Sequence, residues 1–379
     1  MRTEAQNLAL ANAKRIVVKI GSALLTDDGK GLDNQAIVDW VAQMAELIAK
    51  GKELVIVSSG SVAAGMVRLG LQQRPESLSE LQAAAAVGQM RLVQSWESAF
   101  SQFAKHTAQV LLVHDDLSNR PRYLNARNTL QTLIQLGVIP IVNENDTVAT
   151  EEIRFGDNDT LAAAVANLID ADLLVILTDQ DAMYTKDPRH FADAEPIFQT
   201  PANDARLLSM AGGGGELGRG GMTTKVQAAR LASRSGTDTV IVGGRLPQVL
   251  LDLMDADKNA SLGTLLKSDQ ATPLEARKLW LASLTAVAQI ELDSGAVRAV
   301  RQGGVSVLPV GVSAIKGQFN KGDIVECVDA LGEPIAKGLI NYPSSDAAKL
   351  LGQKSEDMVR LLGYRVADEL MHCDNLILL

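Results

Sequence analysis

Cysteine and histidine are scarce in this chain of 379 residues. The sequence contains two cysteines, Cys327 and Cys373, and four histidines. Two distant cysteines cannot form a disulfide framework, and neither residue type recurs at the spacing of metal ligands. The scarcity argues against a zinc centre and against a catalytic triad built on histidine. It predicts reduced thiols, as in a cytoplasmic protein.

Basic charge, aromatic side chains and long apolar runs are also lacking. The formal net charge is −9 and aromatic residues make up 3%, so the chain has neither the basic surface nor the stacking platforms that nucleic acid requires. No run approaches the roughly 18 to 20 apolar residues of a membrane span. The first residues lack the basic start and the cleavage site of a secretory signal. We expect a soluble, cytoplasmic protein without a membrane or nucleic-acid partner.

Six short apolar runs alternate with helical patterns before residue 266. The runs are continuously apolar, which is typical of strands covered on both faces of a parallel sheet. The pattern predicts an α/β fold over residues 1–266, a three-layer αβα sandwich with a mainly parallel sheet, with ligands beyond the carboxyl ends of the strands. The runs are 15–20, 53–59, 109–113, 138–142, 173–178 and 239–244, and a helix is expected at 34–50.

The pattern changes after residue 266. Residues 267–284 have the composition of a linker with some helix, and the short apolar pieces beyond them are interrupted by Gly and Asn. Such interruption is typical of a small antiparallel barrel. We therefore expect a second domain at 285–379, in which nine basic and twelve acidic residues give a net charge of −3.

Small and polar residues follow three of the predicted strands. Lys19 lies inside the first and is followed by Gly21. Its ammonium group either reaches the surface or pairs with a carboxylate, or it faces a phosphate that Gly21 allows to approach. Ser59 ends the second strand before a helix, an arrangement that suits a bound carboxylate or phosphate. Thr178 and Asp179 end the fifth strand, which alone is only a modest indication of nucleotide binding.

A glycine-rich segment occupies residues 211–229. It matches G-x-G-x-x-G, but no strand leads into it, and the chain contains no G-x-x-x-x-G-K-[ST] of the P-loop type. We expect its end, GGMTTK, to open a helix that begins at Lys225 and Val226, where backbone amides, hydroxyls and a lysine would converge. The alternative is a surface loop followed by an ordinary helix cap.

Two clusters of Asn and Asp lie on either side of residues 147–156. Such residues are common in turns and helix caps. They can also receive a small polar ligand, because carboxylates bind an ammonium group while amides bind carboxylates. The clusters are Asn143, Asn145 and Asp146, followed by Asp157, Asn158 and Asp159.

Some members of this region have simpler explanations. Asn145 and Asp157 are equally compatible with turn formation, and Asp157 is well placed to cap the helix that follows. We expect Glu144, Glu151 and Glu152 to be solvated or paired.

In order and spacing, these motifs resemble those of the amino acid kinase family over nearly the whole chain, and the region 285–379 resembles a PUA domain. The resemblance is closest to members that transfer the γ-phosphoryl group of ATP to the side-chain carboxylate of L-glutamate. Their product, L-glutamyl 5-phosphate, begins proline biosynthesis. The motifs are VVKIGS, VSSGSVAAG, AAVGQMRL, YLNARNTL, IVNENDTVAT, GDNDTLAA, LTDQDAMYTKDP, GRGGMTTK and ATPLEARK.

The resemblance implies ATP and Mg²⁺ as cofactors and three catalytic residues. A carboxylate with a pKa near ~4.3 is already ionised at neutral pH, so the reaction needs no general base. It needs relief of repulsion between two anions and stabilisation of charge in the transition state. Lys19 and Lys225 match the family lysines that supply this, and Asp159 matches the aspartate that orients both.

The resemblance also carries over binding residues for ATP and glutamate, and it assigns no metal ligand. Those for ATP are Lys19, Thr178, Asp179, Arg219, Gly220, Gly221, Met222, Thr223, Thr224 and Lys225. Those for glutamate are Ser59, Asn143, Asp146 and Asn158. It further implies feedback inhibition by proline and a homo-oligomer, either a tetramer or a dimer.

Two rival interpretations remain open. The substrate could be that of another family member, such as N-acetylglutamate, aspartate, carbamate or a nucleoside monophosphate. An acylated substrate, however, has no ammonium group for the acidic residues of the two clusters to bind. The PUA-like domain could instead bind RNA as the working part, against which its net charge of −3 weighs.

Overall fold

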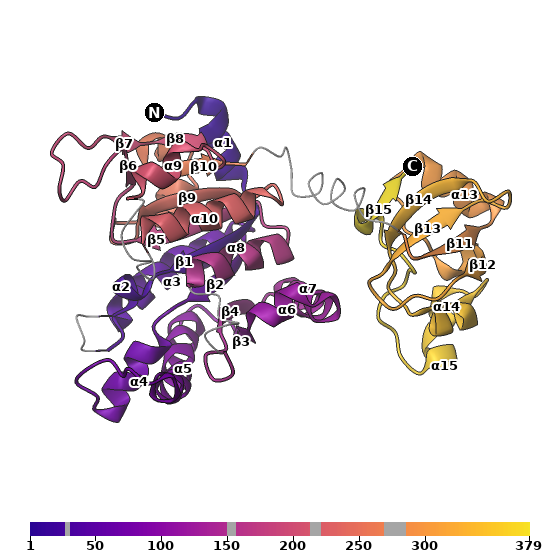
Figure 1. Cartoon of the computed structure of the whole chain (residues 1–379), viewed down its shortest axis with the longest axis horizontal. Coiled ribbons are helices and arrows are strands. Elements are labelled where there is room, and N and C mark those ends of the chain that lie inside the picture. Colours follow the sequence, from indigo (N-terminus) through magenta and orange to yellow (C-terminus); the bar gives the residue numbers. More distant parts are fainter. Residues whose placement is uncertain (27–30, 150–156, 213–220, 269–285) are drawn as a thin grey trace. The chain divides into compact units, whose positions relative to one another are not determined.

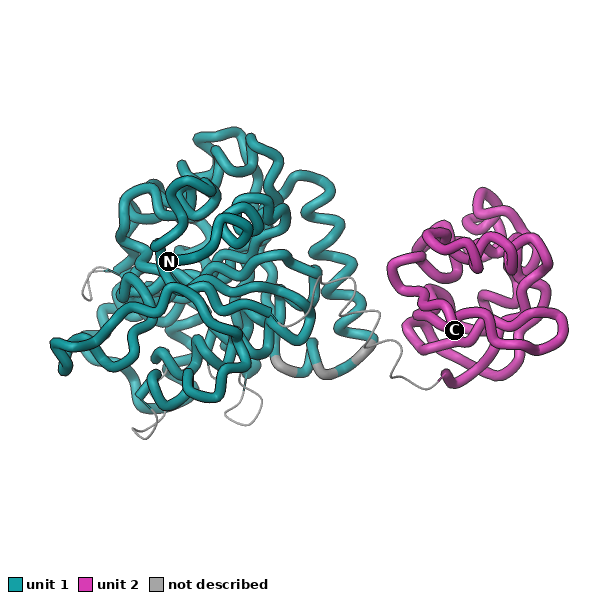
Figure 2. Tube along the Cα trace, turned by 90° about the horizontal axis from the view of Figure 1, so that it is seen from above, with its two compact units in different colours: residues 1–273 teal, residues 274–379 magenta. Residues whose placement is uncertain are grey.

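The structure is a computed structural model that describes residues 1–26, 31–149, 157–212, 221–268 and 286–379. Its contacts divide the chain into two compact units, Met1–Pro273 and Leu274–Leu379 (Figure 2). The predicted linker at 267–284 lies almost wholly outside the described residues. Within the described residues, no helix is both long enough and apolar enough to cross a membrane.

The first unit is built on a sheet that has eight strands within the described residues (Figure 1). Neighbouring strands are parallel except for β10, which runs antiparallel to β9. The spatial order is β3 (Thr107–Leu112), β4 (Ile139–Glu144), β2 (Glu53–Ser58), β1 (Arg15–Ile20), β5 (Leu173–Thr178), β9 (Asp238–Gly243), β10 (Thr264–Lys267) and β8 (Gln199–Pro201). The six predicted strands are all present, and β4 continues two residues beyond its predicted end.

Helices cover both faces of this sheet. Four of them, α3, α5, α7 and α8, begin at side-chain caps: in α3, the Asp33 carboxylate accepts a hydrogen bond from the backbone N–H of Ala36 at 3.0 Å. The helices of the unit are α1 (Glu4–Asn12), α2 (Ser22–Leu25), α3 (Asn34–Ala49), α4 (Ser61–Leu69), α5 (Leu78–Ser101), α6 (His114–Ser118), α7 (Arg120–Gln135), α8 (Asn158–Leu168), α9 (Arg206–Met210), α10 (Met222–Ser233) and α11 (Val249–Leu253). The predicted αβα sandwich is confirmed.

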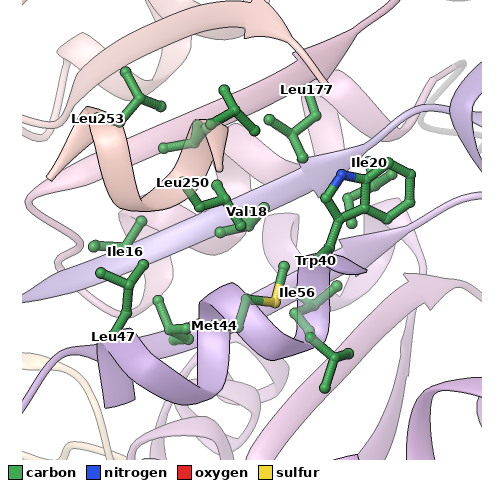
Figure 3. Packing of buried hydrophobic residues seen from close by; sticks show 14 of the residues in the cluster. Ile16, Val18, Ile20, Trp40, Met44, Leu47, Ile56, Leu177, Leu250 and Leu253 are labelled. Atoms are coloured by element: carbon green, nitrogen blue, oxygen red, sulfur yellow. The ribbon is translucent and has the colours of Figure 1, made fainter. Parts of the chain in front are cut away.

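Alternation along β1 separates two hydrophobic cores. Ile16, Val18 and Ile20 face a core shared with α3, α5 and α11 (Figure 3). Val17 faces the opposite core, formed with α8 and α10. Because side chains on a strand alternate in direction, Lys19 lies on the same face as Val17, toward α8 and α10. The alternation of side chains along β1 therefore directs this lysine toward the N-termini of α8 and α10.

The second unit contains one mixed sheet in the order β12 (Val312–Lys316), β11 (Ala288–Leu292), β13 (Ile324–Val328), β14 (Pro334–Leu339) and β15 (Leu376–Leu378). The prediction of an antiparallel barrel is partly wrong, because β11 and β13 pair in parallel. A parallel pair needs a long crossover, and α13 (Ser294–Gln302) and β12 supply it. The helices α14 (Ser344–Leu350) and α15 (Met358–Leu362) complete the unit.

Candidate active site

A pocket of about 540 Å³ lies at the carboxyl ends of the central strands. This is the edge of a parallel sheet where ligands normally bind. The residues that line it come from the ends of β1, β2, β4 and β5 and from the starts of α2, α4, α8 and α10. They are Lys19, Gly21, Ser22, Ala23, Leu24, Ser59, Gly60, Ser61, Val62, Ala63, Arg74, Asn143, Glu144, Asp146, Asp157, Asn158, Leu177, Thr178, Asp179 and Lys225.

Two lysines share one carboxylate in the wall of this pocket. Lys19 Nζ lies 2.5 Å from Asp159 Oδ1, and Lys225 Nζ lies 3.1 Å from Asp159 Oδ2. Asp159 is fully buried and each lysine is 4% exposed. The hydroxyl of Thr224 also donates to Asp159 Oδ2, at 2.8 Å. Of the alternatives given for Lys19, the surface position is wrong and the pairing with a carboxylate is confirmed, because its ammonium group is buried against Asp159.

Burial and charge oppose each other in this cluster. Burial lowers the pKa of Lys19, and the neighbouring Lys225 lowers it further, while Asp159 opposes the shift. For Asp159, burial alone would raise the pKa of the carboxyl group, but the two ammonium groups outweigh it and hold the pKa below its ordinary value. Two positive charges facing one negative charge leave a net charge of +1, which suits an anionic ligand.

The helix α10 begins at Met222, so the predicted start at Lys225 and Val226 is wrong. Lys225 therefore lies in the first turn of the helix, where the backbone N–H groups at its N-terminus favour an anion. Gly221, the residue before the helix, has an extended backbone. The side chains that reach the Asp159 carboxylate from this helix come from Thr224 and Lys225.

Amides form the other side of the pocket. Asn158 Nδ2 lies 2.9 Å from Ser59 Oγ and 3.0 Å from Asn143 Oδ1. The Ser61 hydroxyl donates to Asp146 Oδ2 at 3.3 Å. Three separate segments, 59–61, 143–146 and the start of α8, thus place hydroxyl, amide and carboxylate groups around one space.

The remaining Asn and Asp residues have distinct roles. The Asp157 carboxylate caps α8, accepting from the backbone N–H of Thr160 at 2.8 Å, and also lines the pocket. Burial raises the pKa of Asp157. Asn145 forms a local turn with Thr147, whose hydroxyl lies 2.5 Å from Asn145 Oδ1. Glu144 is 7% exposed, so of the two alternatives given for it, solvated or paired, solvation is wrong, because β4 extends far enough to bury it.

The structure brings together most of the residues proposed from the sequence. Lys19, Ser59, Asn143, Asp146, Asn158, Thr178, Asp179 and Lys225 line the pocket, and Asp159 lies behind the two lysines. Gly221, Met222, Thr223 and Thr224 are at the start of α10. Arg219 and Gly220, like Glu151 and Glu152, lie outside the described residues.

Sequence reasoning missed two residues of the pocket wall. Ser61 follows the Ser59-Gly60 turn, and its place at the first position of α4 could have indicated it. Arg74 lies in the segment between α4 and α5, which carries no motif.

Comparison with known proteins supports the family assignment. Residues 14–243 match the amino acid kinase family and residues 288–362 match the PUA domain. The chain is 57% identical over 371 residues to a glutamate 5-kinase of Pseudomonas putida (strain F1), covering 97% of this chain and 99% of that protein. It is 58% identical over 370 residues to a glutamate 5-kinase of Teredinibacter turnerae, covering 97% and 98%.

A solved structure shares the fold of the first unit. Carbamate kinase from Giardia lamblia bound to AMP-PNP aligns with a TM-score of 0.51 at 18% identity, covering 68% of this chain and all of that chain. At this identity the likeness concerns the fold alone. Together with the sequence matches, it shows that the protein belongs to the amino acid kinase family, as a member of its glutamate 5-kinase group with a C-terminal PUA domain.

Proposed function

We propose that the protein transfers the γ-phosphoryl group of ATP to the side-chain carboxylate of L-glutamate, forming L-glutamyl 5-phosphate as the first step of proline biosynthesis. The observation that carries this proposal is the buried cluster in which Lys19 and Lys225 share Asp159 at the pocket wall. High identity to glutamate 5-kinases along nearly the whole chain supports the choice of substrate.

The chemistry of this transfer suits the cluster. The glutamate carboxylate is ionised at neutral pH and needs no base, but an anion must approach a polyanionic nucleotide. Lys19 from β1 and Lys225 from α10 supply positive charge from two directions. Asp159 holds both ammonium groups in place, so little reorganisation is needed as charge shifts in the transition state. In this proposal the lysines are catalytic and Asp159 positions them.

The two substrates occupy different parts of the pocket. ATP lies toward Thr178 and Asp179 at the end of β5 and toward the start of α10, where backbone N–H groups and Lys225 receive its phosphates. Glutamate lies toward the amides, with its α-ammonium group near Asp146 and its α-carboxylate near donors such as the Ser59 hydroxyl. Asn143 and Asn158 complete this part of the proposed site.

Mg²⁺ fits this pocket as an ion carried by the nucleotide. The pocket offers separate carboxylates, among them Asp157 and Asp179, and these are the oxygen ligands that Mg²⁺ takes in addition to phosphates and water. When bound, the ion neutralises charge on the phosphates. In the described residues, the one group of three potential metal ligands is His372, Cys373 and Asp374 in the second unit, so the kinase pocket has no preformed metal cage among them.

The family resemblance supports three further proposals. Proline inhibits the enzyme by feedback, the chain forms a homo-oligomer, and the enzyme works in the cytoplasm. Proline inhibition is tested by the rate of phosphorylation with and without proline, and oligomerisation by the molar mass of the purified chain in solution.

Trapping with hydroxylamine tests the reaction itself, because hydroxylamine displaces phosphate from an acyl phosphate and gives a hydroxamate, which forms a coloured complex with iron(III). The purified protein is incubated with MgATP and, separately, L-glutamate, N-acetylglutamate or L-aspartate. We expect hydroxamate from L-glutamate and a fall of about 10² to 10³ in kcat for Lys225→Ala, the range for removal of one group that stabilises transition-state charge. Lys50→Ala, at an exposed lysine that follows the last residue of α3, is the matched control and should retain full activity.

The outcomes separate the parts of the proposal. A preference for another acid would keep the chemistry and change the substrate. An absence of hydroxamate from every acid would reject acyl-phosphate formation, and full activity of Lys225→Ala would reject the role of that lysine.

A further inference from the structure

Hydrogen-bonded side-chain amides connect the backbone of β4 to the pocket. The backbone fixes the orientation of the first of these amides, that of Asn143. The backbone N–H of Glu144 lies 2.9 Å from Asn143 Oδ1. A backbone N–H can only donate, so the atom that it meets must be the carbonyl oxygen of the Asn143 amide. The nitrogen Nδ2 then lies at the other end of this amide, where it donates to Gln89 Oε1 at 2.8 Å.

The same logic fixes Asn158. Its Nδ2 lies 3.0 Å from Asn143 Oδ1, which can only accept. It also lies 3.2 Å from the backbone carbonyl of Ser58, a second obligatory acceptor. Backbone groups thus determine the orientation of both amides. The nitrogen of Asn158 faces the wall, and its oxygen Oδ1 is left to accept from a ligand in the pocket.

Gln89 is the hydrogen-bonded amide of this series that lies outside the pocket. It belongs to α5, it is 9% exposed and it is not part of the pocket wall. Within the described part of the chain, its Nε2 is buried without a hydrogen-bond partner, which costs free energy. An apolar side chain would fill this space without that cost. What glutamine adds is the acceptor Oε1 for Asn143.

Close packing holds Gln89 in place. A Cβ atom on the preceding residue, Gly88, would lie 1.8 Å from the backbone oxygen of Ser61. The backbones of α5 and α4 therefore touch beside Gln89, and Ser61 itself lines the pocket. The acceptor is rigid relative to the wall that it supports.

We propose that Gln89 is a positioning residue for substrate recognition. Backbone groups set which way each amide faces. By accepting from Asn143 Nδ2, Gln89 holds the Asn143 amide in that position, and Asn143 Oδ1 in turn holds Asn158 so that Asn158 Oδ1 is presented to the ammonium group of an amino acid. The inference rests on the proposed function, because it concerns the part of the same pocket that receives glutamate. The motif AAVGQMRL, to which no role was assigned above, thereby acquires one through its glutamine.

Three variants test this role. Gln89→Met keeps the length of the side chain and removes the acceptor, Gln89→Glu keeps an oxygen at the same position, and Gln94→Met makes the same change at an exposed site of α5. We expect Gln89→Met to raise KM for L-glutamate about tenfold, the factor expected for one hydrogen bond left unpaired, with KM for ATP unchanged. Gln89→Glu should restore most of the glutamate affinity, and Gln94→Met should behave as the wild type.

A role limited to filling space predicts the opposite ranking, because a buried apolar side chain would then be tolerated better than a buried carboxyl group. A lower glutamate KM for Gln89→Met than for Gln89→Glu would therefore overturn the proposal. So would equal increases in the KM values for glutamate and ATP.

A double-mutant cycle tests the proposed route through Asn158. In an Asn158→Ala background, Gln89→Met should have no further effect on KM for glutamate, since the amide that it orients is gone. Independent, multiplying effects would overturn the proposal. Wild-type turnover in the same assay tests the proposed function separately: if the wild type prefers another amino acid, the same ratios are measured with that substrate, and an unchanged KM for it would reject the role of Gln89.

Discussion

Replacing Asp159 with asparagine removes the charge that two buried lysines share and leaves the side chain's shape unchanged. The carboxylate is fully buried, and the lysine nitrogens lie 2.5 and 3.1 Å from its oxygens. The asparagine oxygen can still accept from the Thr224 hydroxyl, which now donates to Asp159 Oδ2. The main loss is therefore the compensation of charge at Lys19 and Lys225.

The expected destabilisation follows from burial. Removing one partner of a buried ion pair costs about 3–5 kcal/mol, because the remaining charge is left in a poorly solvating environment. The free energy of unfolding of a native protein is typically about 5–15 kcal/mol, so the loss is a large part of the total. Asp159→Asn should also lose most of its activity, because the two ammonium groups would repel each other out of position.

Urea unfolding at pH 7 provides the assay. Trp40 and Trp96 are both buried in the first unit. With the third tryptophan, Trp280, replaced by phenylalanine in all variants, the fluorescence reports the unit that contains the cluster. We expect the unfolding free energy of Asp159→Asn to lie about 3–5 kcal/mol below that of the wild type. Lys50→Ala again serves as the exposed control.

The pH dependence provides a second, sharper test. Burial already lowers the pKa of Lys19, and loss of Asp159 should lower it further. Between the folded-state pKa and the unfolded value, the unfolded chain binds more protons, so stability rises with pH. The deficit of the variant should therefore shrink between neutral pH and pH ~10, the ordinary pKa region of lysine.

At acid pH, the carboxyl group of Asp159 determines whether stability rises or falls with pH. The pKa of Asp159 is lowered in the folded protein, so its contribution is complete above the ordinary value of 3.8 and is lost as pH falls below it toward the folded-state pKa. The variant has no such loss. A deficit below about 1 kcal/mol at pH 7, which is the level of an exposed pair, would refute this reasoning, as would a deficit that grows toward pH ~10.

Two further predictions concern other parts of the chain. Burial raises the pKa of the Cys327 thiol to about 12, and Cys373 is only half-buried; a thiol reagent at pH 8 should therefore react with one thiol per chain before urea is added and with two afterwards. Rapid reaction of both thiols in the native protein would contradict the buried position of Cys327. In the first unit, a Cβ at Gly65 would lie 1.7 Å from the backbone oxygen of Ala84, so Gly65→Ala should destabilise the unit by about 1–3 kcal/mol or more in urea unfolding. An unchanged midpoint would mean that α4 and α5 do not pack backbone to backbone.

Local sequence was sufficient to predict the strands and the edge of the sheet where the pocket lies. The apolar runs around Val17 and Ile176 are continuous because their strands are covered on both faces, and this signal does not depend on distant contacts. In a parallel sheet all carboxyl ends meet at one edge, so Lys19, Ser59 and Asn143 could be expected to lie near each other. The family resemblance, and not the residue pattern, supplied their proposed roles.

Which of these groups pair depends on contacts between segments that are distant in sequence. Asp159 and Lys225 are separated by 66 residues in sequence, and nothing local requires that their side chains meet. Burial likewise depends on neighbours: Glu144 was expected to be solvated or paired, and it is covered because β4 continues past its apolar run. The start of α10 at Met222 was misjudged because glycines and threonines give weak local signals for where a helix begins.

Gln89 illustrates the limit most clearly. In sequence it is one glutamine in a long helix, and the residues beside it indicate no particular chemistry. Its acceptor reaches Asn143 because α5 packs against α4 and the sheet. The helices and strands, and the order of the polar residues along them, could be predicted without the fold, since they follow from short-range periodicity and turn chemistry. The packing of elements far apart in the chain decided the charge balance, burial and amide orientation of the site, because those properties belong to neighbours in space.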